Sequence, residues 1–173
     1  MKLFHTPLFL GITESEFETM KELHSMRSSF FFKNGTIFHT GDLIHEIGII
    51  ESGSVNIENI DLLGNKSILS NISQGQIFAE TYAICHEPML VDVVAIEDTQ
   101  VLFADLDILL SNRYASQPWH AKIMQNILKL SVQKIWFYRI VFSVLLPNDP
   151  LPPFNLSVHG ICQSREYYLS DPL

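Results

Sequence analysis

The chain has 173 residues, of which 47% are hydrophobic, and it carries 11 basic and 19 acidic side chains for a formal net charge of −8. This composition supports a folded core rather than global disorder, and no stretch reaches the ~18 uninterrupted apolar residues of a membrane span. Residues 1–110 hold sixteen of the acidic side chains and five of the basic ones. Because nucleic-acid binding needs clustered lysines and arginines, we expect this region not to bind DNA.

The N-terminal half predicts a short helix followed by a series of strands. Thr13 and Glu16 have the spacing of a capping box, and apolar residues follow at helical spacing, so we expect a helix over about 13–25. Short β-prone runs then alternate with glycine, asparagine and aspartate turn signals. The runs cover residues 30–32, 36–39, 47–50, 55–60, 67–69, 91–96 and 101–104. Short strands at this spacing are typical of an all-β sandwich or barrel.

A long apolar helix is predicted to begin near Pro118, a residue that is tolerated in a first helical turn. A core helix of the same domain is one interpretation of its apolar residues. We favour a helix that pairs two copies of the chain, because the apolar residues keep a heptad period, with Lys134 as the polar exception. The predicted dimer interface consists of Ile123, Ile127, Leu130, Phe137, Val141 and Val144. Four prolines then fall within 147–153 and end the pattern.

Glycine-containing turns occur in an order that carries a family resemblance. The segments are Gly35-Thr36-Ile37, Gly41-Asp42, Ile47 to Val55, Leu63 to Lys66 and Gly75 to Glu80. Over about residues 4–134 the chain resembles the sensor domain of the cyclic-AMP receptor protein and fumarate–nitrate regulator (Crp/Fnr) family of bacterial transcription factors. The resemblance implies a mainly β fold with flanking helices, a double-stranded β-helix of the jelly-roll-like, cyclic-nucleotide-binding type.

The same resemblance divides the chain into three parts. It implies a β-roll sensor domain over 1–112, a dimerisation helix over 113–146 and an irregular tail over 147–173. Members of the family continue into a winged helix-turn-helix, and the tail shows no second amphipathic helix that would fit a major groove. A truncation and a shift of reading frame are both compatible with this tail. We therefore expect no DNA binding by this chain alone.

The family's nucleotide-binding segment combines a short helix, a glutamate that bonds the ribose hydroxyl, and an arginine followed by serine or threonine on the phosphate. The present sequence keeps the glutamate as Glu80, while Ala79 replaces the usual glycine. Leu90 and Val91 stand where the arginine and hydroxyl residue are expected. A buried phosphate without a basic partner is costly. We therefore expect a small-molecule effector other than cyclic AMP or cyclic GMP.

An apolar pocket with a few polar groups would suit such an effector. The expected lining is Phe78, Ala79, Glu80, Thr81, Tyr82, Leu90, Val91, Val93, Val141 and Phe142. Simple packing of the barrel explains the apolar members equally well, and Glu80 is equally interpretable as a capping or turn-closing carboxylate.

A metal-dependent cupin enzyme is the main alternative function, since cupins share the β-barrel layout. His39 and His45 lie six residues apart and form no His-x-His pair, so we expect no metal site, no cofactor and no enzymatic activity. The first cysteine is Cys85, which excludes an N-terminal iron–sulfur cluster. With two cysteines and no signal-peptide pattern, we expect a cytoplasmic transcriptional regulator whose partners are a second copy and a small effector, and not a membrane.

Overall fold

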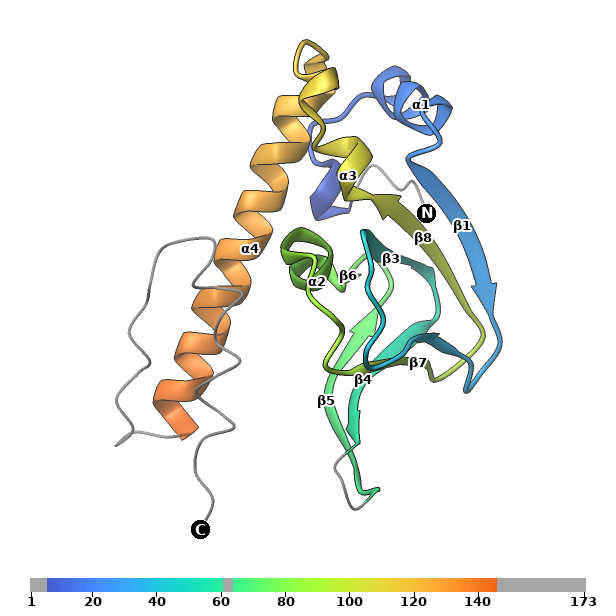
Figure 1. Cartoon of the computed structure of the whole chain (residues 1–173), viewed down its shortest axis with the longest axis vertical. Coiled ribbons are helices and arrows are strands. Elements are labelled where there is room, and N and C mark those ends of the chain that lie inside the picture. Colours follow the sequence, from blue (N-terminus) through green and yellow to red (C-terminus); the bar gives the residue numbers. More distant parts are fainter. Residues whose placement is uncertain (1–5, 61–63, 146–173) are drawn as a thin grey trace. The chain divides into compact units, whose positions relative to one another are not determined.

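The computed structural model describes residues 6–60 and 64–145, with side chains up to residue 132 (Figure 1). The chain divides into two compact units, residues 1–130 and 131–173. The first unit contains all strands of the described residues. The described part of the second unit is the last half of a long helix.

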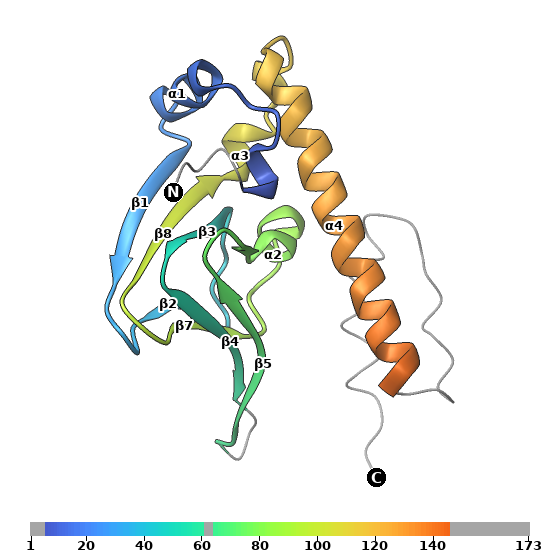
Figure 2. The same ribbon diagram turned by 180° about the vertical axis from the view of Figure 1, so that it is seen from behind.

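Two antiparallel four-stranded sheets form the barrel, which confirms the predicted mainly β, jelly-roll-like architecture with flanking helices. The first sheet has the order β1 (Met26–Phe31), β8 (Thr99–Asp105), β3 (Glu46–Ser52) and β6 (Ile77–Phe78). The second has the order β2 (Thr36–Phe38), β7 (Asp92–Ala95), β4 (Ser54–Ile60) and β5 (Lys66–Ser73). Figure 2 shows β1, β8 and β3 running side by side.

The capping box predicted at Thr13 is present. The hydroxyl of Thr13 accepts from the backbone N–H of Glu16 at 3.3 Å, and the Glu16 carboxylate accepts from the backbone N–H of Thr13 at 2.7 Å. The helix α1 (Glu14–Glu22) ends three residues before the expected limit, because His24 takes a left-handed conformation with φ 54°. A short 3-10 turn, η2 (Pro7–Phe9), precedes it.

Three short helical segments follow, and the sequence predicted none of them from periodicity. They are α2 (Glu80–Cys85), α3 (Leu106–Leu109) and η3 (Asn112–Tyr114). The two-residue strand β6 was also not expected, and β5 extends further than the predicted 67–69. Segments of two to six residues are too short to show a 3.6-residue or two-residue period.

The central strands of the first sheet are buried on both faces, so they separate two apolar cores. Successive strand side chains point to opposite faces: along β8, Val101 and Phe103 enter the barrel interior, while Leu102 and Ala104 pack toward the helices. The same alternation explains the almost continuous apolar run of β3, whose Ile49 and Ile50 belong to different cores.

The long helix α4 (Pro118–Leu145) starts within the helix-side core. Trp119, Ile123 and Ile127 are buried there, and Lys122 forms an ion pair with Glu16 at 2.8 Å. The first compact unit therefore runs to residue 130, past the boundary expected at residues 112 and 113. Among the described residues, no helix is both long and apolar enough to cross a membrane.

This burial concerns three residues of the predicted dimer interface, which stays a prediction. Ile123 and Ile127 are covered by the chain's own N-terminal elements, and Leu130 packs against the same core. In the single chain Ile123 and Ile127 thus belong to the domain's own core, and Leu130 is partly buried. The side chains of the other predicted interface residues, Phe137, Val141 and Val144, lie outside the described residues.

Candidate functional site

The site begins at the turn from β6 into α2. Ala79 has φ 67°, a left-handed conformation, and this reversal starts the helix at Glu80. The ring of Phe78 lies so close to Gly48 on the neighbouring strand β3 that a Cβ at Gly48 would overlap it. Gly48 is therefore required for the ring to enter the barrel. The carboxylate of Glu80 is buried, and its Oε1 accepts from the hydroxyl of Thr81 at 3.4 Å.

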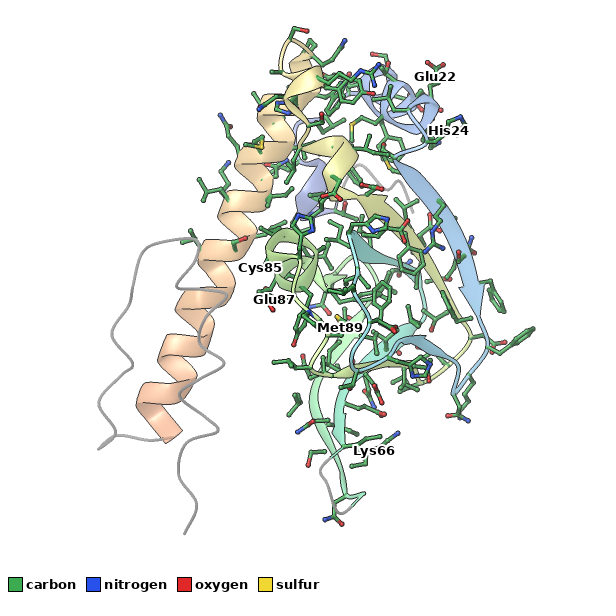
Figure 3. The ribbon with its side chains drawn as sticks, viewed as in Figure 1. Glu22, His24, Lys66, Cys85, Glu87 and Met89 are labelled. Atoms are coloured by element: carbon green, nitrogen blue, oxygen red, sulfur yellow. The ribbon has the colours of Figure 1, made fainter. Side chains whose placement is uncertain are left out.

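Aromatic rings pack the barrel interior beside this turn. The ring of Phe38 contacts those of Phe78 and Phe103 at centroid distances of 6.1 and 5.6 Å, in edge-to-face geometry. Met89 is buried among them (Figure 3).

The structure distributes the predicted pocket residues over different environments. Phe78, Val91 and Val93 are buried in the barrel core, and Ala79 and Tyr82 pack at its margin. Thr81 and Leu90 are exposed, and Leu90 retains 51% of its accessible surface. The side chains of Val141 and Phe142 lie outside the described residues.

Leu90 and Val91 differ in their exposure. The side chain of Val91 is buried in the barrel core, and the side chain of Leu90 is exposed to solvent. Neither side chain can supply a positive charge to a phosphate. The sequence offers no substitute nearby, because no lysine or arginine occurs between residues 67 and 112.

The basic side chains within the strands are already neutralised by carboxylates. Arg27 of β1 binds Glu46 with two nitrogens and lies 4.1 Å from the centroid of the Phe103 ring. Lys66, at the start of β5 on the β4–β5 hairpin (Figure 3), pairs with the buried carboxylate of Glu58. Charge–charge attraction to a further anion is therefore weak at both positions.

Asp92 lies directly opposite Glu58 in the β4–β7 register. Its Oδ1 accepts from the backbone N–H of Thr40 at 2.7 Å and from the Thr40 hydroxyl at 2.9 Å. The hydrogen bond from the Thr40 N–H, more than that from its hydroxyl, holds the pKa of Asp92 below its ordinary value. The carboxylate fixes the turn after β2 (Thr36–Phe38) onto β7.

The two histidines considered for a cupin-type metal site, His39 and His45, lie at the two ends of the loop between β2 and β3. His39 and His45 are both exposed, and His45 Nε2 lies 3.6 Å from Asp105 Oδ2. Within residues 6–60 and 64–132, no three His, Cys, Asp or Glu side chains come close enough together to hold a metal ion.

An apolar stripe on α4 was missed by the sequence analysis. Met124, Leu128 and Val132 are spaced by four residues and retain 47%, 65% and 44% of their accessible surface. Met124 and Leu128 each lie one residue after a predicted interface position, Ile123 and Ile127, so the predicted apolar face differs from the exposed one. The heptad pattern shows that one face is apolar, and only the fold shows which face the chain itself covers.

Comparison with protein families matches residues 29–111 to the family described as the cyclic nucleotide-binding domain. The curated proteins give no match. Among solved structures, the catabolite activator protein of Thermus thermophilus is similar with a TM-score of 0.62 and 22% identity, over 80% of this chain and 63% of that one. The chain thus spans less than two thirds of that regulator.

Two isolated domains of transcriptional regulators are matched over most of their length. The sensor domain of the transcriptional regulator DNR from Pseudomonas aeruginosa has a TM-score of 0.60 and 16% identity, over 87% of this chain and 92% of that one. The N-terminal domain of a transcriptional regulator from Streptomyces coelicolor A3(2) has a TM-score of 0.61 and 17% identity, over 77% of this chain and 93% of that one. At these identities the similarity establishes the fold, which is that of a cyclic nucleotide-binding domain.

Proposed function

We propose that this chain provides the effector-sensing domain of a cytoplasmic, bacterial Crp/Fnr-like transcriptional regulator, with a small-molecule effector other than cyclic AMP. The fold supports the sensing role. The observation that supports the choice of effector is the pair Leu90 and Val91, which by the resemblance stand where the family has its phosphate-binding arginine and hydroxyl residue, and which carry no positive charge. No catalytic step is assigned to the domain.

The energetic argument concerns the phosphate. A hydrogen bond to a charged group contributes about 1.5–3 kcal/mol, so the loss of a bidentate arginine and a hydroxyl weakens binding by roughly a hundredfold or more. An effector without a phosphate avoids this cost.

Calorimetric titration of the full chain with cyclic AMP and cyclic GMP tests the proposal. We expect no heat of binding in the micromolar range. A micromolar Kd for either nucleotide would contradict the proposed effector class. Thermal unfolding in the presence of a collection of uncharged small molecules provides the positive arm, since a ligand that binds the folded state raises Tm.

We also propose that two copies pair through the exposed stripe of Met124, Leu128 and Val132 on α4. Its spacing of four residues suits helix–helix packing, and an isolated apolar stripe on a helix favours association. In this proposal the exposed stripe takes the place of Ile123 and Ile127 in the dimer interface, because those two side chains are buried within the domain.

The chain is further proposed not to bind operator DNA by itself. The excess of acidic side chains in residues 1–110 supports this, because phosphate contacts need clustered basic residues. An electrophoretic shift of DNA by the purified chain at ~0.15 M salt, where weak phosphate contacts are screened, would contradict it.

A further inference from the structure

Strand β1 is an edge strand of the first sheet. On one side it pairs with β8, in a continuous register from Met26 opposite Ala104 to Phe31 opposite Thr99. On its other side, no strand of the described residues pairs with it. Backbone groups on the outer edge of such a strand are a template for pairing with another chain. Natural proteins usually protect such edges with bulges, prolines or charges.

The other long edge strand, β5, has this protection and provides an internal comparison. Ser70 lies opposite Ile57 and Ile68 lies opposite Glu58, so Leu69 is an extra residue that forms a bulge. A bulge disrupts the ladder locally and bends the strand. The register of β1 has no such shift.

Two exposed aromatic rings lie at the C-terminal end of this edge strand: Phe30 belongs to β1, and Phe32 follows it by one residue. Phe30 retains 54% and Phe32 73% of its accessible surface, and Phe32 is the most exposed large apolar side chain of the described residues. Their rings meet edge to face with centroids 5.2 Å apart. By strand alternation they share a face with Met26, which packs against the helix-side core. Nothing among the described residues covers this ring pair.

We propose that β1 pairs antiparallel with β1 of a second copy, about a two-fold axis at Ser29. In this register Ser28 lies opposite Phe30 of the second copy, and Met26 lies opposite Phe32 of the second copy. Each large ring thus meets a small or flexible side chain. On the other face, Arg27 lies opposite Phe31 of the second copy, an arrangement that favours a cation–π contact. The two-fold axis makes the same patch serve both copies.

Charge favours a second copy at this edge. Residues 23–41 contain no acidic side chain, in a chain whose net charge is −8. The charge of Arg27 is balanced by Glu46 of the same chain. The two β1 strands therefore place no like charges directly opposite each other. The carboxylates that contact β1, those of Glu46 and Glu51, belong to β3 and accept hydrogen bonds from Arg27 and Ser28.

Sedimentation velocity of the full chain tests the pairing. Phe30→Lys combined with Phe32→Lys places charges in the proposed contact, and we expect it to halve the mass of the associated species. Leu43→Lys is the matched control, because Leu43 is similarly exposed but lies outside the strands, and we expect it to keep the wild-type mass. An unchanged mass in the double variant overturns the proposal.

The same experiment in a Leu128→Asp background separates this edge from the α4 stripe. We expect Leu128→Asp to leave a dimer that the two lysine substitutions convert to a monomer. Leu128→Asp alone could leave the mass unchanged while Phe30→Lys with Phe32→Lys still halves it. That result would contradict pairing through α4 and support pairing through β1. Phe30→Ser with Phe32→Ser adds no charge and repeats the test if the lysine variant unfolds. A chain that stays monomeric at all concentrations overturns the pairing as well.

Discussion

The side-chain amide of Asn126 donates a hydrogen bond of 2.8 Å to the carbonyl oxygen of Leu8. The same nitrogen donates to the carbonyl oxygen of Leu10 at 2.9 Å. One buried side chain of α4 thus donates to two carbonyl groups in and just after the N-terminal 3-10 turn. Of these two residues, Leu8 is fully buried and Leu10 is exposed. Together with the Lys122–Glu16 ion pair, Asn126 fixes the first half of α4 to the domain.

Asn126→Ala is therefore expected to destabilise the fold by about 1–3 kcal/mol, because it removes two hydrogen bonds and takes the side-chain donor from the buried carbonyl group of Leu8. Urea unfolding followed by circular dichroism measures the change. The neighbouring Gln125 is exposed, so Gln125→Ala is the control and should shift the free energy of unfolding by less than about 0.5 kcal/mol. Equal effects of the two substitutions would contradict the role of Asn126.

The left-handed conformation of Ala79 predicts a stabilising substitution. A side chain at φ 67° costs roughly 1 kcal/mol, and glycine avoids this strain, although glycine loses more backbone entropy on folding. We expect Ala79→Gly to raise the free energy of unfolding by up to about 1 kcal/mol. Ala83, buried within α2, is the matched control: Ala83→Gly should lower stability by about 1 kcal/mol. A loss of stability in Ala79→Gly would show that the turn is not strained.

Asp92 gives a prediction for pH dependence. Its pKa is lowered in the folded state, mainly by the Thr40 N–H, so its contribution to stability is complete above the unfolded pKa of about 3.9. The contribution is lost as the pH falls through the lower, folded pKa. The stability difference between the wild type and Asp92→Asn should thus be constant above about pH 5 and shrink below about pH 4. Chemical unfolding at several pH values measures it.

The exposed carboxylate Glu22, at the end of α1, provides the control for this titration. Glu22→Gln also replaces one carboxylate by an amide, so its profile gives the comparison for Asp92→Asn. If the stability of Asp92→Asn depends on pH in the same way as that of Glu22→Gln, the hydrogen bonds from Thr40 do not favour the charged form of Asp92.

The sequence predicted features that depend on local chemistry. The capping box at Thr13 and the strands between glycine turns were identified because hydrogen bonding and backbone freedom are encoded within a few residues. It did not predict the left-handed Ala79, since alanine carries no signal for that conformation. The burial of Ile123 and Ile127 could not be found either, because it depends on the N-terminal segment more than a hundred residues earlier.

Restoring the family's phosphate contacts tests the interpretation of the nucleotide segment. Leu90 is half exposed and has room for a longer side chain, so Leu90→Arg with Val91→Ser is expected to bind cyclic AMP at least about tenfold more tightly than the wild type. Calorimetry measures both. The same pair combined with Glu80→Gln is the control, and it should lose part of the gain. No gain in the double variant would show that these positions do not face a nucleotide.

The exposed stripe of α4 leads to a substitution that separates pairing from folding. Leu128→Asp with Val132→Asp places two charges on side chains that meet solvent in the single chain, so the domain should stay folded while pairing through α4 is lost. Ile127→Asp, one residue away, buries a carboxylate in the domain's own core and should unfold it instead. Light scattering gives the mass, and circular dichroism checks the fold. Gln125→Asp adds a charge to another exposed position of the same helix and should alter neither. A folded Leu128→Asp, Val132→Asp variant whose mass equals that of the wild type would mean that this stripe is not where two copies meet.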